Sequence, residues 1–446
     1  MTETISLRAR IAARLPALVA VLVFGVFVIL FWRDRPAYDA LLRASGTLPV
    51  ELSGTAPRQG GQPFFDTRFV LAQLQCWRRG IDVYVVNPCD PIGRLQDYSP
   101  LWLRLGFIPA TPDHVVPFGL ALDVAFLASL FLLPLPRPRL ADCAALSLTM
   151  VSTATIFAME RGNTDLLMFA MCAVAGRLLS RPLPSRLAGY AVILAAAALK
   201  FYPLVALAVV LRERMRVLLA VAAAAAVAVI AFAWRYGAET QRALANTAGG
   251  YFGDTWGAFS LPFGGSGLAI RALADDMARH PGLREAAGHA IPLMLFAVLL
   301  SVAATLAIRL ATQAEFARAC AALPERTRTF LIIGATLTAG CFLSHQNIGY
   351  RALILVLEMP GLLALARGTA AARLRSLLWA NVLATVFLVW NTPGLLSSFS
   401  PAGWFLRQYV WWAHVTVSLA VPVRFGLESA GWRWLCSATR RVHGVA

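Results

Sequence analysis

Charged residues are scarce in this chain. They make up 14% of its 446 residues, whereas hydrophobic residues make up 59% and the mean hydropathy is +0.66. Soluble domains carry about 25% charged residues, so the composition excludes a water-soluble globule. Apolar runs of about 20 residues recur, and each is long enough to cross a hydrocarbon core about 30 Å thick. Because these runs lack the alternation of barrel strands, they predict an all-α polytopic membrane protein.

Acidic residues and lysine are also few. The chain has 23 acidic and 40 basic residues, a net charge of +17, and its one lysine is Lys200. In a soluble protein such an excess of basic residues would indicate nucleic-acid binding. Here many arginines lie at the ends of apolar runs, where membrane topology and anionic headgroups require them. The charge therefore argues for membrane lipids and against nucleic acid as partners.

The seven cysteines lack the spacing of a metal site, and five of them lie in or beside apolar runs. Cys76 and Cys89 fall instead in a polar segment that we place outside the cytoplasm, where both a disulfide and two free thiols are open outcomes. The first apolar run, 16–32, follows three arginines and lacks a small-residue cleavage site. We expect it to be a retained helix whose N-terminal end stays in the cytoplasm.

Arginines at the ends of the apolar runs orient the spans. They predict about 12 transmembrane helices in a single domain, 1–446, with both chain ends in the cytoplasm. The segments 33–114 and 235–289 would be the first and second extracytoplasmic loops. The expected spans lie near 15–32, 115–135, 141–158, 165–179, 217–234, 290–310, 329–343, 352–366, 377–390 and 408–427, with two short helices inside 187–211.

The run 187–211 is interrupted by the sequence KFYP at 200–203. Proline breaks the hydrogen-bond ladder of a helix, and a single span would place the arginines of 212–216 outside. We therefore expect two short helices that meet in the outer half of the membrane, a kind of break that often marks a binding site. A cation there is costly unless it is paired or hydrated. Lys200 either extends to the membrane surface or is held for an anionic group such as phosphate.

Two further polar segments, 160–165 and 344–351, are predicted to lie on the same outer face. Glu160 and Arg161 either bind substrate or pair with each other to pin two helices. Arg351 either binds substrate or anchors its helix in the interface. The candidate substrate-binding residues are Lys200, Tyr202, Glu160, Arg161, Asn163, Asp165, His345, Gln346, Asn347, Tyr350 and Arg351.

The first loop contains most of the candidate catalytic acids. Its acidic residues are Asp34, Asp39, Glu51, Asp66, Asp82, Asp90, Asp97 and Asp113, and most acids in such a loop are solvated. Asp66 differs because aromatic residues precede it and can dock it against the membrane-facing body. Asp82 is the second candidate, although its place beside Tyr84 also fits a loop-packing contact. A carboxylate near several cations beside a membrane is typical of base-assisted transfer from a lipid phosphate.

Two segments carry a resemblance to a known family. The sequences ERGNTD at 160–165 and ALKFYP at 198–203 resemble the paired motifs of bacterial glycosyltransferase family 87, which includes polyprenyl-phosphate-mannose-dependent α-1,2-mannosyltransferases. The first loop is similar to the family pattern of Asp, GxDxY and YPPL, with Asp66, GIDVY at 80–84 and YSPL at 98–101; Ser99 stands where the family usually has proline. The resemblance covers about residues 60–216 and recurs weakly at 344–351.

The resemblance implies a GT-C-type fold in the bacterial inner membrane, with the active site on the extracytoplasmic side. Asp66 would be the catalytic acid–base residue, with Asp82 as the alternative. The enzyme would move a sugar from a polyprenyl monophosphate to a lipid or glycan hydroxyl with inversion, while Lys200, Arg351 or Arg161 stabilises the departing phosphate. The outer loops contain no DxD metal motif, which agrees with transfer that needs neither metal nor cofactor.

Two other functions compete with this hypothesis. A transporter or flippase of a lipid-linked sugar would also use a broken helix and a buried cation, but it should present polar groups toward both faces. A glycan ligase with a diphosphate-linked donor should show more outward-facing arginine near a large loop. Because the polar residues are predicted to gather on one face, the sequence favours the glycosyltransferase.

Overall fold

The structure, a computed structural model, shows a helical membrane protein. It describes residues 7–47, 63–135, 139–247, 249–344, 346–391 and 396–442. These residues form two compact units, unit 1 from 1–207 with 219–248 and unit 2 from 208–218 with 249–446. The prediction of a single domain concerns how the two units join, and it stays a prediction.

Nine helical segments in the described ranges are long and apolar enough to cross a membrane. They are Ile11–Arg33, Pro112–Leu130, Leu140–Arg161, Met215–Ala245, Pro281–Thr312, Glu325–Ser344, Gly349–Gly368, Ala372–Val389 and Pro401–Leu427. The chain is therefore an all-α, multi-pass membrane protein, as its composition predicts. The other three expected spans are helices of 15, 17 and 11 residues, so the count of about 12 stays a prediction.

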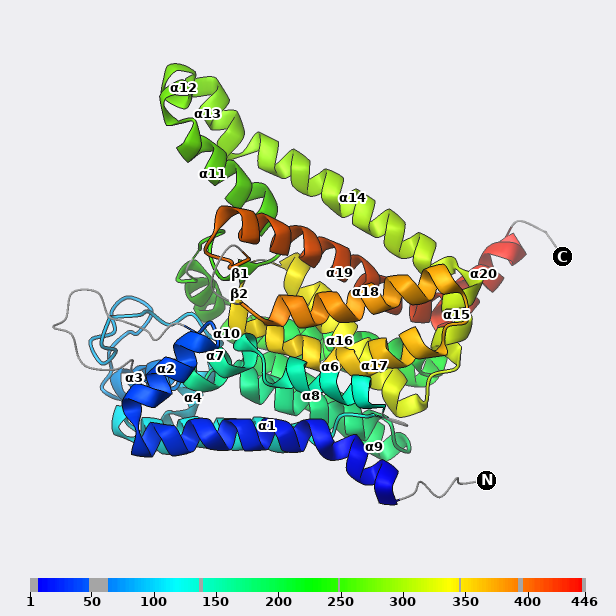
Figure 1. The fold of residues 1–446 in the computed structure, drawn as a ribbon, viewed down its shortest axis with the longest axis horizontal. Helices are drawn as coiled ribbons and strands as arrows, with labels where there is room; N and C mark the ends of the chain where they lie inside the picture. The colour runs from blue at the N-terminus through cyan, green and yellow to red at the C-terminus, as the bar shows by residue number, and fades with distance from the viewer. Residues whose placement is uncertain are drawn as a thin grey trace. The chain divides into compact units, whose positions relative to one another are not determined.

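Unit 1 contains long helices and several shorter helices near their ends. Its elements are α1 (Leu7–Arg33), α2 (Arg35–Ala44), α3 (Phe65–Arg78), α4 (Leu101–Arg104), the short helices η1 (Leu105–Phe107) and η2 (Pro112–His114), α5 (Val115–Leu130), α6 (Leu140–Met150), α7 (Thr153–Arg161), α8 (Asp165–Leu179) and α9 (Leu183–Leu199). The 3-10 helix η3 (Tyr202–Arg212) and α10 (Met215–Ala245) include residues of both units. Helix α8 packs against α5 and α9, and α1 packs against α6, while α2, α3, α4 and α7 lie toward one end of α1 (Figure 1).

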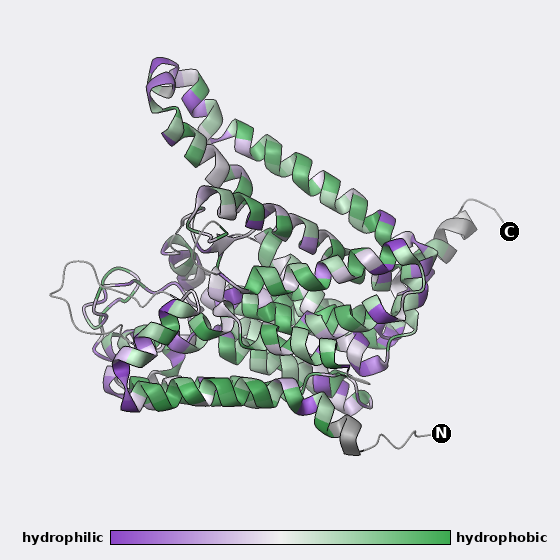
Figure 2. Cartoon of the chain, viewed as in Figure 1, coloured by the Kyte–Doolittle hydropathy of each residue, from purple (hydrophilic) through white to green (hydrophobic). Residues whose placement is uncertain are grey.

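The surface of α1 shows why this bundle belongs in lipid. Its middle is hydrophobic along its length and its hydrophilic residues lie near its ends (Figure 2). Leu22 and Ile29 are 71% and 61% exposed, so apolar side chains cover the outside of the helix as well as its packed face. A helix that is apolar all round is stable where hydrocarbon replaces water.

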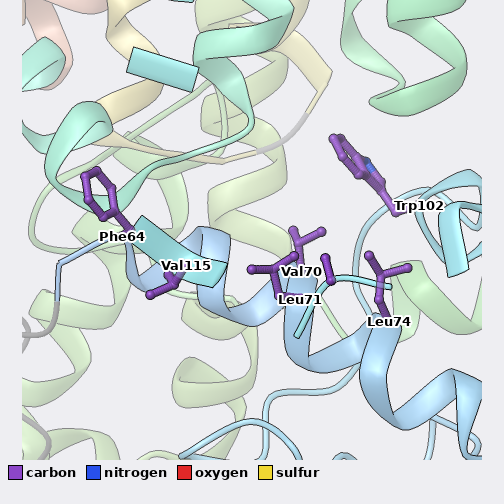
Figure 3. Close-up of a cluster of buried hydrophobic side chains, with 7 residues drawn as sticks. Phe64, Val70, Leu71, Leu74, Trp102 and Val115 are labelled. Carbon is purple, nitrogen blue, oxygen red and sulfur yellow. The ribbon is translucent and has the colours of Figure 1, made fainter. Parts of the chain in front are cut away.

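The described part of the expected first loop belongs to unit 1 and packs on other segments of that unit. One face of α3 packs on the segment that contains α4 and on the start of α5, and this packing fixes the helix that carries Asp66. Figure 3 shows the apolar cluster that does so, with Phe64, Val70, Leu71, Leu74, Trp102 and Val115 labelled. Cys76 and Cys89 form a disulfide, which ties the end of α3 to the loop that follows. The sequence had left this bond open.

Helix α10 continues to Ala245, beyond its expected end near residue 234. Its last turns are polar, but they contact the first-loop segment rather than water alone. Glu239 pairs with Arg104 at 2.5 Å, and Asn246, just after the helix, donates to the carbonyls of Tyr84 and Gln96, each at 3.1 Å. Hydropathy detects where a helix leaves the hydrocarbon, and these contacts keep it helical further on.

Unit 2 contains the remaining elements. They are β1 (Thr255–Trp256), the π-helix η4 (Ser260–Gly264), α11 (Gly265–Ala272), α12 (Ala274–Arg279), α13 (Pro281–Gly288), α14 (Ala290–Thr312), α15 (Ala314–Ala321), α16 (Glu325–Ser344), β2 (Asn347–Ile348), the 3-10 helix η5 (Gly349–Ile354), α17 (Leu355–Gly368), α18 (Ala372–Val389), α19 (Pro401–Leu427) and α20 (Ala430–Val442). Helix α17 packs between α16 and α18, and α19 contacts α14 and α16. Strands β1 and β2 pair antiparallel, with Trp256 opposite Asn347.

Candidate functional site

The first site residue is held where α3 begins. Asp66 is the second residue of α3, and the residues on both sides of it bind the junction between α7 and α8. The backbone N–H of Phe64 donates to the carbonyl of Glu160 at 2.6 Å, and the Thr67 hydroxyl donates to the carbonyl of Gly162 at 2.7 Å. Gly162 has φ +56°, and a Cβ there would lie 2.4 Å from Thr67 Oγ1. The turn after Arg161 therefore requires glycine.

The Asp66 carboxylate is buried and fully bonded. Nε and Nη2 of Arg161 donate to it at 2.8 and 2.6 Å, Nδ2 of Asn163 at 2.5 Å, and Nη1 of Arg94 at 3.4 Å. Burial by itself would raise the pKa of Asp66, but Arg161, Asn163 and Arg94 together lower that pKa below its usual value. Asp66 is therefore an anion that organises the donors around it.

Lys200 lies at the break that the KFYP sequence predicts. Helix α9 ends at Leu199, and Lys200 has extended backbone before η3 begins. Its Nζ lies 2.6 Å from Oδ1 of Asp165, 3.1 Å from Oγ1 of Thr164 and 3.5 Å from Oδ1 of Asn163. The side chain is buried among these acceptors rather than extended to a surface, so the cost of a cation in the membrane is met by pairing. The break is confirmed; a reversal of chain direction across it stays a prediction.

The Asn163 side chain contacts both Asp66 and Lys200 and so links the two residues. Its Nδ2 donates to Asp66, while its Oδ1 accepts from the backbone N–H of Asp165 at 2.8 Å and faces Lys200. The Tyr202 hydroxyl donates to Asp165 at 3.0 Å. We call the following residues the charge network: Asp66, Asp90, Arg94, Arg161, Asn163, Asp165 and Lys200.

One stretch of the first loop runs along this network. Arg94 binds Asp90 at 2.8 Å as well as Asp66, and its guanidinium lies 3.8 Å from the centre of the Phe65 ring. Further along, the Ser99 hydroxyl donates to the carbonyl of Ala198 at 2.6 Å and the indole of Trp102 to that of Leu199 at 3.0 Å. The stretch is therefore fastened at both ends, to Asp66 and to the last turn of α9.

Asp97 lies within that fastened stretch. Its Oδ1 is buried and has no hydrogen-bond partner among the described residues. The pKa of Asp97 is raised to about 6, chiefly by burial; the Asp66 charge acts in the same direction, and Lys200 and Arg94 act in the opposite one. One oxygen of this carboxyl is therefore unsatisfied within the described ranges, and the pKa of the group lies well above its ordinary value.

An apolar cavity of about 380 Å³ borders the break at Lys200. Its wall includes Ala197, Ala198 and Phe201 on one side and Phe232 of α10 on the other, and Thr240 and Gln241 add polar groups at one part of the wall. Lining residues of the cavity thus stand directly before and after Leu199 and Lys200 in the sequence. The Leu199 carbonyl accepts from Trp102, and Lys200 belongs to the charge network. The arrangement fits an amphiphilic ligand, with an apolar chain in the cavity and a polar group near Lys200.

The two remaining unit 1 candidates lie apart from the charge network. Glu160 lines a separate, smaller cavity of about 40 Å³ with Tyr38 and Asp123, and its Oε2 has no hydrogen-bond partner in the described chain. Asp82 is 48% exposed at its side chain and pairs with Arg242, a hydrogen bond that lowers the Asp82 pKa. An exposed ion pair is a weak interaction, and it leaves Asp82 facing solvent.

The candidates from 344–351 belong to unit 2. Asn347 donates to the carbonyl of Cys341 at 2.7 Å and accepts from Arg351 at 2.6 Å, while Gln346 accepts from the backbone of Gly250 at 3.0 Å. Tyr350 is buried in η5, and His345 lies outside the described residues. Lys200 and Arg351 fall in different units, so their predicted approach to a common cavity stays a prediction.

Sequence reasoning missed three residues of this site: Asp90, which pairs with Arg94, then Arg94 itself, and Asp97. Arg94 lies between the quoted motifs, and nothing local marks it as the partner of Asp66, 28 residues away. Asp97 directly precedes the YSPL segment, and this position could have marked it as a candidate. On sequence alone it was instead grouped with the solvated acids of the loop. Arg94 and Asp97 both depend on which distant segments meet.

Comparison of the chain with models of protein families, with curated proteins and with solved structures gives no match.

Proposed function

We propose that this chain is a membrane glycosyltransferase. It would move a sugar, such as mannose, from a polyprenyl-phosphate donor to a hydroxyl of a lipid-linked or glycan acceptor, with inversion. The site would lie on the extracytoplasmic side of a bacterial inner membrane. The observation that carries the proposal is the junction of a buried charge network with a 380 Å³ apolar cavity at the Lys200 break.

The chemistry of the donor matches both sides of this junction. A polyprenyl chain is apolar and fits a cavity lined by alanine, leucine and phenylalanine. Its phosphate needs cationic donors as negative charge develops on the leaving oxygen. Arg161 and Lys200 are held in place by Asp66 and Asp165, so they are positioned before the reaction begins.

Transfer of labelled sugar tests the proposal directly. The full chain, purified in detergent, is incubated with radiolabelled polyprenyl-phosphate mannose and a membrane-lipid extract. We expect label to appear in an acceptor product and the product to have inverted anomeric configuration. Lys200→Met should abolish transfer. The matched control is Arg318→Met, which also replaces a basic residue by methionine but at an exposed position.

Other outcomes would point to other functions. Donor that crosses a liposome membrane without losing its sugar would favour a transporter or flippase. Transfer that requires a diphosphate-linked glycan would favour a ligase. Intact donor in every arm, with folded protein, would contradict the proposed reaction.

A further inference from the structure

Two carboxylates of the first loop, those of Asp66 and Asp97, are both influenced by Arg94 but differ in what their oxygens contact. From this difference we infer that Asp97, rather than Asp66, accepts the proton of the acceptor hydroxyl; the inference rests on the proposed sugar transfer. A general base must lie within hydrogen-bond reach of the proton that it takes, so an oxygen must be able to receive the hydroxyl.

The oxygens of Asp66 are already occupied. Its Oδ1 accepts from Arg161 and Arg94, and its Oδ2 accepts from Arg161 and Asn163. An ionised carboxylate offers about four acceptor sites, so a hydroxyl would have to displace one of these charge-assisted bonds. Asp66 is therefore suited to fix Arg161 and Arg94, and it is a positioning residue.

Asp97 is placed to meet a hydroxyl beside the cationic groups. Three residues before it, Arg94 binds Asp66, and two residues after it, Ser99 binds the last turn of α9. The ring of Tyr98, its neighbour, lies 5.0 Å from Lys200 Nζ. Its buried Oδ1, without a hydrogen-bond partner among the described residues, is costly unless a donor group satisfies it.

Burial is the main reason why Asp97 takes up a proton more readily than an exposed carboxyl, and the charges around it modify that effect. Lys200 after α9, Asp66 on α3 and Arg94 on its own loop are the charged groups that act on it. The three cations of the charge network, Arg94, Arg161 and Lys200, are paired with three carboxylates, Asp66, Asp90 and Asp165. An ionised Asp97 is a fourth carboxylate in this setting, but burial is the largest cause of its raised pKa of about 6.

The transfer step balances as follows. The acceptor O–H gives its proton to the Asp97 carboxylate, and the acceptor oxygen forms a bond to the anomeric carbon. The bond from that carbon to the phosphate oxygen breaks, and its electron pair leaves with the polyprenyl phosphate. Asp97 ends neutral, which relieves its burial cost, and it returns the proton to water before the next turnover.

The pH dependence of transfer by the full chain separates the two acids. Because the ionised form is the base, wild-type kcat should rise with pH through an apparent pKa near 6. Asp97→Asn should lower kcat by about 10²- to 10⁴-fold and remove this acid limb, and Asp97→Glu should restore part of both. Asp66→Asn should weaken donor binding and keep the limb. Asp113→Asn, an exposed acid of the same loop, should behave as wild type.

The results also distinguish this assignment from the proposed function. Wild-type transfer with an unchanged kcat and acid limb in Asp97→Asn would overturn the role of Asp97 alone. Loss of the limb in Asp66→Asn, with the limb kept in Asp97→Asn, would assign the base to Asp66. A wild type that transfers no sugar from any polyprenyl-phosphate donor would overturn the reaction and this assignment together.

Discussion

The charge network of unit 1 and a second polar network in unit 2 are both buried, but they are built from different parts of helices. The second, which we call the helix-centre network, consists of Glu358, Asn381, His414 and Ser418. The Ser418 hydroxyl donates to Glu358 at 2.8 Å, and Nε2 of His414 lies 3.6 Å from the other oxygen of Glu358. The four residues join α17, α18 and α19: Asn381, His414 and Ser418 lie well inside α18 and α19, and Glu358 lies in the first turn of α17, which continues directly from η5.

This difference separates a structural role from a functional one. In the helix-centre network each polar group ties one continuous helix to the next, and Gly334 of α16 lets the Glu358 backbone approach, since a Cβ there would lie 2.4 Å from Glu358 N. The charge network comes instead from helix ends and a loop, and residues directly before and after Leu199 and Lys200 line a cavity. Burial of a polar group therefore does not by itself indicate a site; burial beside a cavity, at interrupted helices, does.

Removing the Lys200 charge should give the largest effect. Lys200→Met leaves the buried Asp165 carboxylate without its cation, which should cost about 3–5 kcal/mol of stability. Lys200→Met with Asp165→Asn removes both charges and should regain most of that stability, as measured by thermal unfolding in detergent. Transfer should stay at least about 10²-fold below wild type in both variants. Recovery of transfer together with stability would make the charge network structural, like the helix-centre network.

Removing Glu358 should give the converse result. Glu358→Ala leaves a cavity and removes partners of Ser418 and His414, so it should lower stability by about 2–4 kcal/mol. Transfer per molecule of folded protein should be unchanged at a temperature where the variant remains folded. A loss of kcat much larger than the loss of folded protein would end the contrast between the two networks.

Asp97→Asn should stabilise the protein in a pH-dependent way. The folded-state pKa, about 6, is above the ordinary value near 3.8, so wild type loses stability as pH rises from about 4 through 6. The asparagine variant does not pay this cost and should be more stable by about 1–3 kcal/mol above pH 7, with little difference near pH 4. Melting curves at the two pH values measure this. Equal differences at both would contradict a buried, titrating Asp97.

Asp82→Asn should have the smallest effect. Asp82 is exposed and its partner Arg242 is a surface residue, so stability should change by no more than about 0.5 kcal/mol and transfer should stay near wild type. Inactive Asp82→Asn, measured beside active Asp66→Asn and Asp97→Asn, would return the base to Asp82.

Local sequence was sufficient for much of this protein. Hydropathy predicted nine helices that the structure confirms, and proline after Lys200 predicted the break. The conformation of Gly162 is also local, as is the hydrogen bond from the Asp165 N–H to Asn163 Oδ1. The ERGNTD segment therefore indicated a polar turn. These features depend on a residue and its near neighbours, through backbone conformation and the transfer of side chains into lipid.

Tertiary structure alone decided the chemistry of the acids. Asp66 meets Arg161 across 95 residues of sequence, which makes it a bonded anion, whereas one oxygen of Asp97 has no hydrogen-bond partner in the part of the chain that the structure describes. Asp82, which looked similar in sequence, ends in solvent. The proton affinity of a carboxyl follows from its desolvation and from the charges within a few ångströms, and those are set by which distant segments pack together.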